Sequence, residues 1–445
     1  MRNYFIIFLI LNFFGPAGVA QTDGKSKQFV EKLFKTSLND QSAFQDLSYI
    51  SNRIGSRLPA SRGEVKMIGY LKGRLDSLVD NTTQKLFNSV QWVRGTPARG
   101  FSVDSKDGRE SIKVAAAMGA TPTRQTGTEA DILALESLAD FDELSKEQVS
   151  GKFILLNISL ETNQTDVFDR FDYLKSKLNH IVQKSSRMRA MGVLMRSLCF
   201  DYSGEPHSYW IHYGEEVPIP VAFLNPEQAD FLSTLSKLNP KSRFSLSMNC
   251  RLIKNKKRSV LNAELKAKSN PAKEIVLQTP LNSSDLGDGI QKATSTAQFL
   301  AVFELFKKLN YQPKHDIRLI TVPTYPKQNK ALEDQINTFL GINQNSVVIK
   351  NNQGGENPIG FQFPEGGKWK TIKSKANELL GDQGIAYFPQ KKDTQNNIKM
   401  LTNSQGYFDL INSEADKLDK VNSRELALGT AALATLIYTI DQNLD

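Results

Sequence analysis

Residues 274–309 constrain the fold of this chain more than any other stretch. They begin with an apolar run at residues 275–277, which gives way to a polar loop that contains Gly287 and Gly289. Apolar residues then recur at a spacing near 3.6 over residues 299–309, which indicates a helix. A buried strand that leads through a loop into a helix is typical of open α/β sheets, where ligands bind beyond the carboxyl ends of the strands. We therefore expect a functional site at this loop.

Similar patterns in the rest of the C-terminal half predict strands that alternate with helices. The strands are expected at residues 262–267, 274–279, 316–322, 346–349 and 384–388, and the helices at residues 293–308, 330–340, 371–380 and 423–440. This alternation is typical of an α/β fold with a mixed, mainly parallel sheet flanked by helices on both faces.

The N-terminal half starts with helices and then becomes rich in short strands. Helices are expected at residues 25–38, 42–54 and 62–78, and again at 167–185 and 226–235. Strands are expected at residues 83–92, 112–118, 130–135, 152–156, 192–196, 219–224 and 243–248. The α/β pattern returns from about residue 260.

The first 20 residues have the features of a secretory signal peptide. Arg2 precedes an apolar run at residues 4–14, and small residues end at Ala20, where we expect cleavage. This run is too short to span a bilayer, and no other stretch reaches the ~18 apolar residues that a transmembrane helix needs. We expect a secreted or periplasmic protein without a transmembrane segment, and a buried N-terminal strand is the alternative.

The formal net charge is +9, but the lysines and arginines are scattered along the chain. The one short basic run, at residues 254–258, is interpreted as a solvated loop between strands. We therefore expect no binding of nucleic acid.

Two cysteines, Cys199 and Cys250, lie in a chain that is expected to be exported, where disulfides persist. The sequence leaves a disulfide and two free buried thiols equally open. Their separation does not match the spacing of a redox or zinc motif.

Residues 276–296 read VLQTPLNSSDLGDGIQKATST and carry a resemblance to a known family. They align without a gap with a strand and loop that read like VLGGHLDSWDVGTGAIDDGAG in the di-zinc exopeptidases of metallopeptidase family 28. RIGSRLPAS at residues 53–61 resembles the beginning of the plasma glutamate carboxypeptidase-like branch, and residues 421–438 resemble the end of the family domain. The resemblance implies a zinc-exopeptidase-like domain with an active site for peptide hydrolysis.

The strand-rich segment resembles a protease-associated domain that is inserted into the peptidase. The matching stretches are DELSKEQVSGKFILLN, AMGVLMRS and EPHSYWIHYGEEVPIPVAFLNPEQADFL. The resemblance implies a signal peptide at residues 1–20, a peptidase-like domain at 21–100 and 256–445, and an inserted β-rich protease-associated-like domain at 101–255. Such an insert shapes substrate access and oligomer contacts.

A di-zinc hydrolase needs histidine and carboxylate ligands, one carboxylate that bridges both metals, and a general base. In the first loop the resemblance puts Pro280 at a ligand histidine, Asn282 at its neighbouring aspartate and Lys292 at the bridging aspartate. The second loop, IRLITVPTYP, puts Tyr325 at the general base and Pro326 at a ligand. None of these residues suits its position.

The third and fourth loops show the same replacement. VVIKNNQG puts Asn352 at a ligand aspartate, and YFDLINSEADKLDKV puts Ile411 and Asn412 where two histidines stand in the family. An ammonium group at Lys292 would repel a doubly charged metal, and amides are poor substitutes for carboxylates on zinc. The resemblance thus implies lost metal sites, so no cofactor is predicted, although zinc is the cofactor of the family.

Other polar residues do not rebuild the site. Asp285, Asp288, Asp409 and Asp416 lie in loops expected to face it, where two of them could act as acid and base. Capping and salt-bridge roles are the simpler interpretation. The histidines are His180, His207, His212 and His315, of which His207 and His212 could form a metal pair but lack a third ligand nearby in sequence.

The sequence therefore predicts a non-catalytic homologue of a secreted di-zinc exopeptidase, with peptide or partner binding as the retained activity. Candidate cleft residues are Asn282, Asp285, Asp288 and Asp409. Lys292 and Tyr325 could form a hydrogen bond that replaces the metals. The alternatives are an active zinc-dependent aminopeptidase or dipeptidase with rearranged ligands, and a subunit that forms a homodimer or pairs with an active paralogue.

Overall fold

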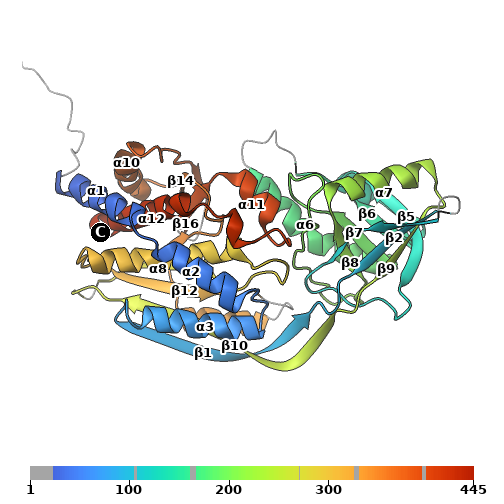
Figure 1. The fold of residues 1–445 in the computed structure, drawn as a ribbon, viewed down its shortest axis with the longest axis horizontal. Helices are drawn as coiled ribbons and strands as arrows, with labels where there is room; N and C mark the ends of the chain where they lie inside the picture. The colour runs from blue at the N-terminus through green and yellow to red at the C-terminus, as the bar shows by residue number, and fades with distance from the viewer. Residues whose placement is uncertain are drawn as a thin grey trace, which may run out of the picture.

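The computed structural model describes residues 24–104, 108–160, 167–269, 271–324, 330–392 and 397–444. The expected signal peptide, Tyr325 and Pro326 lie outside these residues. The described chain forms two lobes, each built on its own eight-stranded sheet (Figure 1). We call them the α/β lobe and the insert lobe. No helix within the described ranges is long and apolar enough to cross a membrane.

The sheet of the α/β lobe is mixed. Its strands, in spatial order, are β1 (Asn81–Val93), β10 (Arg251–Leu265), β12 (Asp316–Val322), β11 (Glu274–Pro280), β13 (Ser346–Lys350), β16 (Asn397–Thr402), β14 (Pro358–Pro364) and β15 (Gln390–Lys391). The central strands β12, β11, β13 and β16 run parallel. Strand β1 pairs antiparallel with β10, β10 with β12, and β14 with β16, whereas β14 and β15 pair in parallel. The expected parallel sheet is confirmed at its centre.

Helices cover both faces of this sheet. They bury the apolar side chains of β11, which point alternately to one face and the other. The helices are α1 (Gly24–Leu38), α2 (Ser42–Tyr49), α3 (Arg62–Leu75), α8 (Ile290–Lys308), α9 (Lys330–Leu340), α10 (Lys368–Gly381) and α12 (Ser423–Asn443). Helix α11 (Ser404–Leu410) instead packs its Tyr407 and Phe408 into the core of the insert lobe. Ile275 and Leu277 pack into the large core beneath α8 and α12, whereas Val276 points to the opposite face, under α9. Successive strand residues face opposite ways, so a strand buried on both sides reads as a continuous apolar run.

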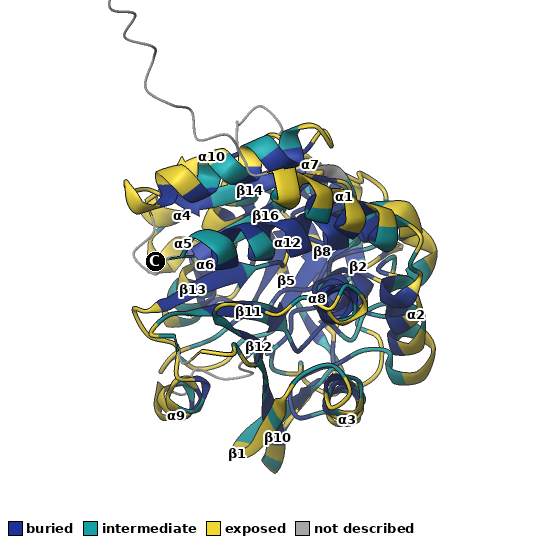
Figure 2. Ribbon diagram, turned by 90° about the vertical axis from the view of Figure 1, so that its left-hand side faces the viewer, coloured by how far each residue is buried: buried dark blue, intermediate teal, exposed yellow. Residues whose placement is uncertain are grey.

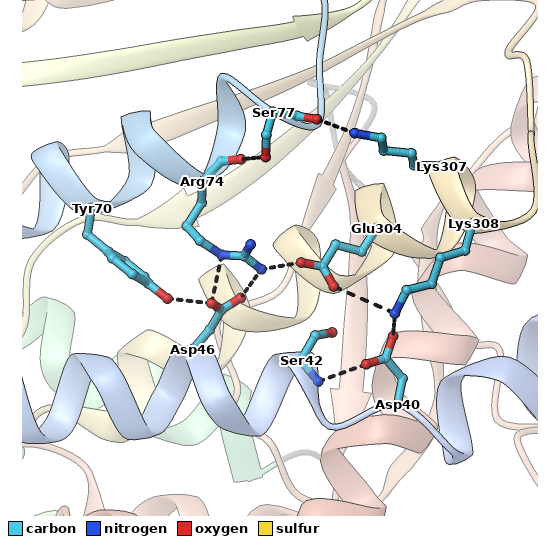
Figure 3. Close-up of polar contacts among 9 residues, drawn as sticks. All are labelled: Asp40, Ser42, Asp46, Tyr70, Arg74, Ser77, Glu304, Lys307 and Lys308. Carbon is cyan, nitrogen blue, oxygen red and sulfur yellow. Dashed lines mark hydrogen bonds and ion pairs between the residues drawn. The ribbon is translucent and has the colours of Figure 1, made fainter.

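Helix α8 is the centre of the α/β lobe and is buried almost all round (Figure 2). It packs against α12 and α2. Ion pairs along the edge of α8 that is not buried hold the N-terminal helices in place (Figure 3). Arg74 of α3 binds Asp46 of α2 at 2.9 Å and also contacts Glu304 of α8. Lys308 at the end of α8 binds Asp40, 2.5 Å away. The N-terminal helices are thus tied to α8 by charge as well as by apolar contact.

Within its described residues, the insert lobe has a second mixed sheet with four helices around it. Its strands, in spatial order, are β3 (Gly108–Ile112), β2 (Arg99–Asp104), β9 (Arg243–Ser247), β5 (Thr128–Leu135), β6 (Phe153–Leu156), β7 (Gly192–Arg196), β8 (Val221–Leu224) and β4 (Ala115–Ala116). The helices are α4 (Leu138–Glu143), α5 (Lys146–Val149), α6 (Val167–Arg187) and α7 (Pro226–Leu238). The lobe has its own apolar core, which includes Phe153, Phe223 and Phe244.

A long antiparallel ribbon of β1 and β10 joins the two lobes (Figure 1). The expected loop at residues 254–258 is therefore wrong, because this run lies inside β10 and pairs with β1. Most of this part of the ribbon is exposed, so its sequence lacks the alternating apolar pattern that marks a half-buried strand. Arg258 is the exception and is completely buried. The expected domain boundary at residues 255 and 256 falls within the same strand.

Most other expected elements are confirmed, and two are not. Residues 384–388 form no strand, because Tyr387 makes a single bridge to Gly360 and no ladder follows. The expected strand at 112–118 divides between the end of β3 and the short β4. Strands β14 and β16 were not expected, and they pair antiparallel at the far side of the sheet.

Candidate functional site

A pocket of about 420 Å³ lies at the carboxyl ends of the parallel strands, between the two lobes. Pro280 ends β11, Val322 ends β12 and Lys350 ends β13, and all three line it. The insert lobe contributes Phe171, Lys175, Tyr209 and Trp210, among others. The site therefore lies where strand topology predicts it, but one of its walls comes from the other lobe.

The loop between β11 and α8 turns at two glycines with left-handed backbone. Gly287 has φ 63° and Gly289, the residue before α8, has φ 66°. A Cβ atom at Gly289 would lie 2.2 Å from the hydroxyl of Ser283. Arg57 is completely buried and holds the turn by donating to the carbonyl oxygens of Gly289, at 2.7 Å, and Asp288, at 3.2 Å. Burial lowers the pKa of its guanidinium to about 10.

Lys292 lies in the first turn of α8 and lines the pocket. Its ammonium group donates a hydrogen bond to the hydroxyl of Tyr407 at 3.1 Å. Desolvation lowers the pKa of Lys292, while the charges of Asp172 and Asp416 oppose this shift. The partner is thus a tyrosine of α11, and the expected partner, Tyr325, lies outside the described residues.

Asn282 is the centre of a buried polar network. Its side-chain amide donates to Glu64 at 2.6 Å, and its side-chain oxygen accepts from Arg258 at 2.9 Å and from the backbone N–H of Thr324 at 2.8 Å. Glu64 and Arg258 form an ion pair at 3.1 Å, with side-chain exposures of 1% and 0%. This network fixes the end of β11 to the end of β12.

Glu64 and Arg258 are the important residues that the sequence analysis missed. Arg258 ends a basic run that suggested solvent exposure, yet residues 259–261 directly after it, which include the apolar Val260 and Leu261, are buried in β10. That change of pattern is the only local signal of its burial. Glu64 carried no signal beyond its place in the first turn of a helix.

The candidate carboxylates are all engaged away from the pocket. Asp285 forms an ion pair with Arg94 at 2.6 Å, and Asp288 accepts a hydrogen bond from Ser51 at 2.7 Å. Asp409 accepts from two backbone N–H groups, both at 2.8 Å. Of the expected cleft residues only Asn282 lines the pocket, since Asp285, Asp288 and Asp409 are not among its lining residues.

Asp416 is buried and accepts a hydrogen bond from the backbone N–H of Gln291 at 2.8 Å. Desolvation raises the pKa of its carboxyl to about 7. Glu356 shows the same shift, also to about 7 and also mainly through desolvation. These contacts correspond to loop capping, which was the simpler interpretation of Asp416.

The four replaced ligand positions that the structure describes do meet in the pocket. Pro280, Lys292, Asn352 and Asn412 all line it. Asn412 has a left-handed backbone, with φ 59°. The resemblance therefore aligned residues that are spatial neighbours, although they come from three loops far apart in the chain.

These residues do not fit a pair of zinc ions. The side chain of Pro280 has no ligand atom, Lys292 brings a cation, and the two asparagines bring neutral amides. Among the described residues, no three His, Cys, Asp or Glu side chains lie together so that they could hold a metal ion. Of the histidines, His180 contacts Asp142 and His315 contacts Asp441.

The two cysteines are buried and free, so the structure resolves the alternative in favour of thiols. Burial raises the pKa of Cys199 to about 12 and that of Cys250 to about 11. Neither lines the pocket.

Comparison with solved structures identifies the fold. The peptidase M28 precursor from Shewanella amazonensis SB2B superposes with a TM-score of 0.84 at 18% sequence identity, over 94% of this chain and 97% of that one. The chain has the M28 peptidase fold. Searches of protein-family models and of curated protein sequences found no match.

Two further structures share the M28 fold with this chain. The aminopeptidase from Aneurinibacillus sp. strain AM-1 has a TM-score of 0.61 at 12% identity, over 92% of this chain and 95% of that one. The zinc aminopeptidase BSAP from Bacillus subtilis has a TM-score of 0.58 at 14% identity, over 89% and 94%. The expected zinc-exopeptidase-like fold is thus confirmed over nearly the whole chain.

Proposed function

We propose that this protein is a non-catalytic homologue of the M28 exopeptidases, which keeps their cleft for binding a peptide or a partner and does not hydrolyse peptide bonds. One observation carries this proposal. Within the described residues, the pocket at the strand ends is lined by three lysines and by no aspartate, glutamate or histidine.

Zinc-dependent hydrolysis needs ligands for the metal and a base that removes a proton from the attacking water. The described part of the pocket offers neither. The carboxyl of Asp416, whose charge acts on Lys292, is buried and already accepts a backbone hydrogen bond. The phenol of Tyr407 is held by Lys292, and desolvation raises its pKa far from the range of a useful base.

The runner-up is an active zinc-dependent aminopeptidase or dipeptidase. The fold favours it, since the zinc aminopeptidase BSAP and the Aneurinibacillus aminopeptidase share that fold. Its metals would have to be held by a ligand set other than the four positions that Pro280, Lys292, Asn352 and Asn412 occupy. The retained cleft is common to both functions.

The same proposal extends to the rest of the chain. The insert lobe acts as a protease-associated-like domain that limits access to the pocket, because its residues form one wall of it. The protein is exported through its N-terminal signal peptide. It works as a homodimer or together with an active paralogue.

Metal analysis and a peptidase assay on the same sample test the proposal. The mature protein is dialysed against zinc and then against metal-free buffer, and zinc per chain is measured by elemental mass spectrometry, with BSAP as the positive control. We expect far less than one zinc per chain and no release of amino acids or dipeptides from a peptide library. One or two retained zinc ions with chelator-sensitive hydrolysis would establish the runner-up instead.

A further inference from the structure

The pocket between the lobes is lined by positively charged side chains. Lys175, Lys292 and Lys350 line it, and the described residues add no acidic lining side chain. Lys175 comes from α6 of the insert lobe, whereas Lys292 comes from α8 of the α/β lobe. Both lobes therefore contribute to the positive charge of the pocket.

The charge of Lys292 acts on Lys175, the lysine from the other lobe. Desolvation and then the positive charge of Lys292 lower the pKa of Lys175, which nevertheless keeps contact with solvent. Asp172 and Asp416 partly compensate Lys292 from outside the pocket lining. Two ammonium groups that repel each other in one pocket are stabilised by an anion placed between them.

The rest of the lining suits an organic ligand. Trp210, Tyr209 and Phe171 supply aromatic surface from the insert lobe, and Ser283 and Asn352 supply polar groups from the α/β lobe. A volume of about 420 Å³ lies within the range of small-molecule sites, roughly 300–1,000 Å³. Such sites combine apolar walls with a few polar groups that orient the ligand.

We propose that the pocket binds a small organic anion, whose carboxylate or phosphate group contacts Lys175 and Lys292 while its apolar body packs against the aromatic wall of the insert lobe. This inference rests on the proposed function, since it puts an anion where the exopeptidases hold metals. It names the ligand class of the retained cleft, namely short peptides with a free terminal carboxylate or organic phosphates.

Matched probes test the inference. Calorimetry compares N-acetylphenylalanine with N-acetylphenylalaninamide, which differs only in lacking the carboxylate, and phenyl phosphate distinguishes the phosphate source. Comparison of phenyl phosphate with inorganic phosphate, which has no apolar body, measures how much the aromatic wall contributes to binding. We expect at least one of the two organic anions to bind. If the acid binds, the amide should bind at least about tenfold more weakly, because it lacks the charge that the lysines contact. Added salt should weaken the binding of the anion but not that of the neutral amide.

Variants then assign the binding to the two lysines. Lys175→Gln and Lys292→Gln are each expected to lower the affinity for the anion by about tenfold or more. Lys177→Gln removes the same charge from the same helix but from a residue that does not line the pocket, so it should bind as the wild type does. Lys175→Arg keeps the charge and should retain most of the affinity, and circular dichroism checks that each variant is folded.

Failure of the inference is distinct from failure of the proposed function. All titrations use buffers depleted of metal with a chelating resin, so zinc does not contribute to binding. Equal binding of acid and amide, no binding of any anion at millimolar concentration, or undiminished binding by both glutamine variants overturns the inference. Zinc-dependent hydrolysis in the separate assay overturns the proposed function, whatever the anion result.

Discussion

The ammonium group of Lys292 donates to the hydroxyl of Tyr407 across a sequence separation of 115 residues, at 3.1 Å. This contact ties the first turn of α8 to α11. Helix α11 in turn packs on α6 through Phe408 and Phe168, whose ring centroids are 4.7 Å apart. A cation and a phenol thus connect the two lobes at the position where the resemblance to the exopeptidases implies a bridging carboxylate.

Substitution of Tyr407 by Phe should destabilise the protein more than substitution of Lys292 by Met. Tyr407→Phe leaves a partly buried ammonium group without its acceptor and should cost about 1–3 kcal/mol. Lys292→Met removes the cation together with its desolvation cost and should stay within about 1 kcal/mol of the wild type. Urea unfolding measures both, and equal losses would contradict the expected penalty for an ammonium group without its acceptor.

The buried ion pair between Glu64 and Arg258 should behave as one unit. Glu64→Gln or Arg258→Met leaves the other charge buried without its counter-ion and should each cost about 3–5 kcal/mol. The double variant should lose clearly less than the sum of the two. A double-mutant cycle in urea measures the coupling energy, and additive losses would contradict the network described here.

Asp416 should make folding stability fall as the pH rises. Burial raises its pKa to about 7 in the folded protein, above the ordinary value of 3.8. The folded state therefore binds the proton more tightly, so this contribution is fully present below the ordinary pKa and is lost as the pH rises through about 7.

Asp416→Asn should accordingly flatten the decline of the melting temperature across this window, because the amide oxygen can still accept from Gln291. Glu356, whose pKa is also raised to about 7, should keep part of the decline in the variant. Asp382→Asn, at an exposed position after α10, is the control and should follow the wild type. An unchanged profile in the Asp416 variant would contradict the assignment.

The turn before α8 should require glycine at position 289. Gly289→Ala combines a left-handed backbone with a Cβ atom 2.2 Å from Ser283 and should cost roughly 2–4 kcal/mol. Gly341→Ala has a similar φ of 59° but no atom within 4 Å of the new Cβ, so it should cost only about 1 kcal/mol. Thermal unfolding compares them, and equal losses would mean that the packing against Ser283 does not matter.

The two thiols should be unreactive in the folded protein. Cys199 and Cys250 are buried, and burial raises the pKa of both, so few thiolates form at neutral pH. We expect no labelling by a thiol reagent under native conditions and two labelled thiols per chain in denaturant without reductant. Absence of labelling in denaturant would indicate a disulfide.

The sequence by itself determined the α/β fold around residues 274–309, because the periodicity of apolar residues records which faces of a strand or helix are buried. It also determined that residues unsuited to zinc stand at Pro280, Lys292, Asn352 and Asn412, since side-chain chemistry is a local property. Both results survive in the structure, where the strand, the glycine loop and the helix lie as expected and the four residues meet in one pocket.

Only the tertiary structure decided which distant groups face one another. Arg258 ended a run of charges that suggested solvent, yet it is buried against Glu64, and Lys175 reaches the pocket from the insert lobe. Tyr407 receives the hydrogen bond of Lys292, whereas the expected partner, Tyr325, lies outside the described residues. Local patterns report burial but not partners, because the partner of a buried charge depends on the relative placement of segments far apart in the chain.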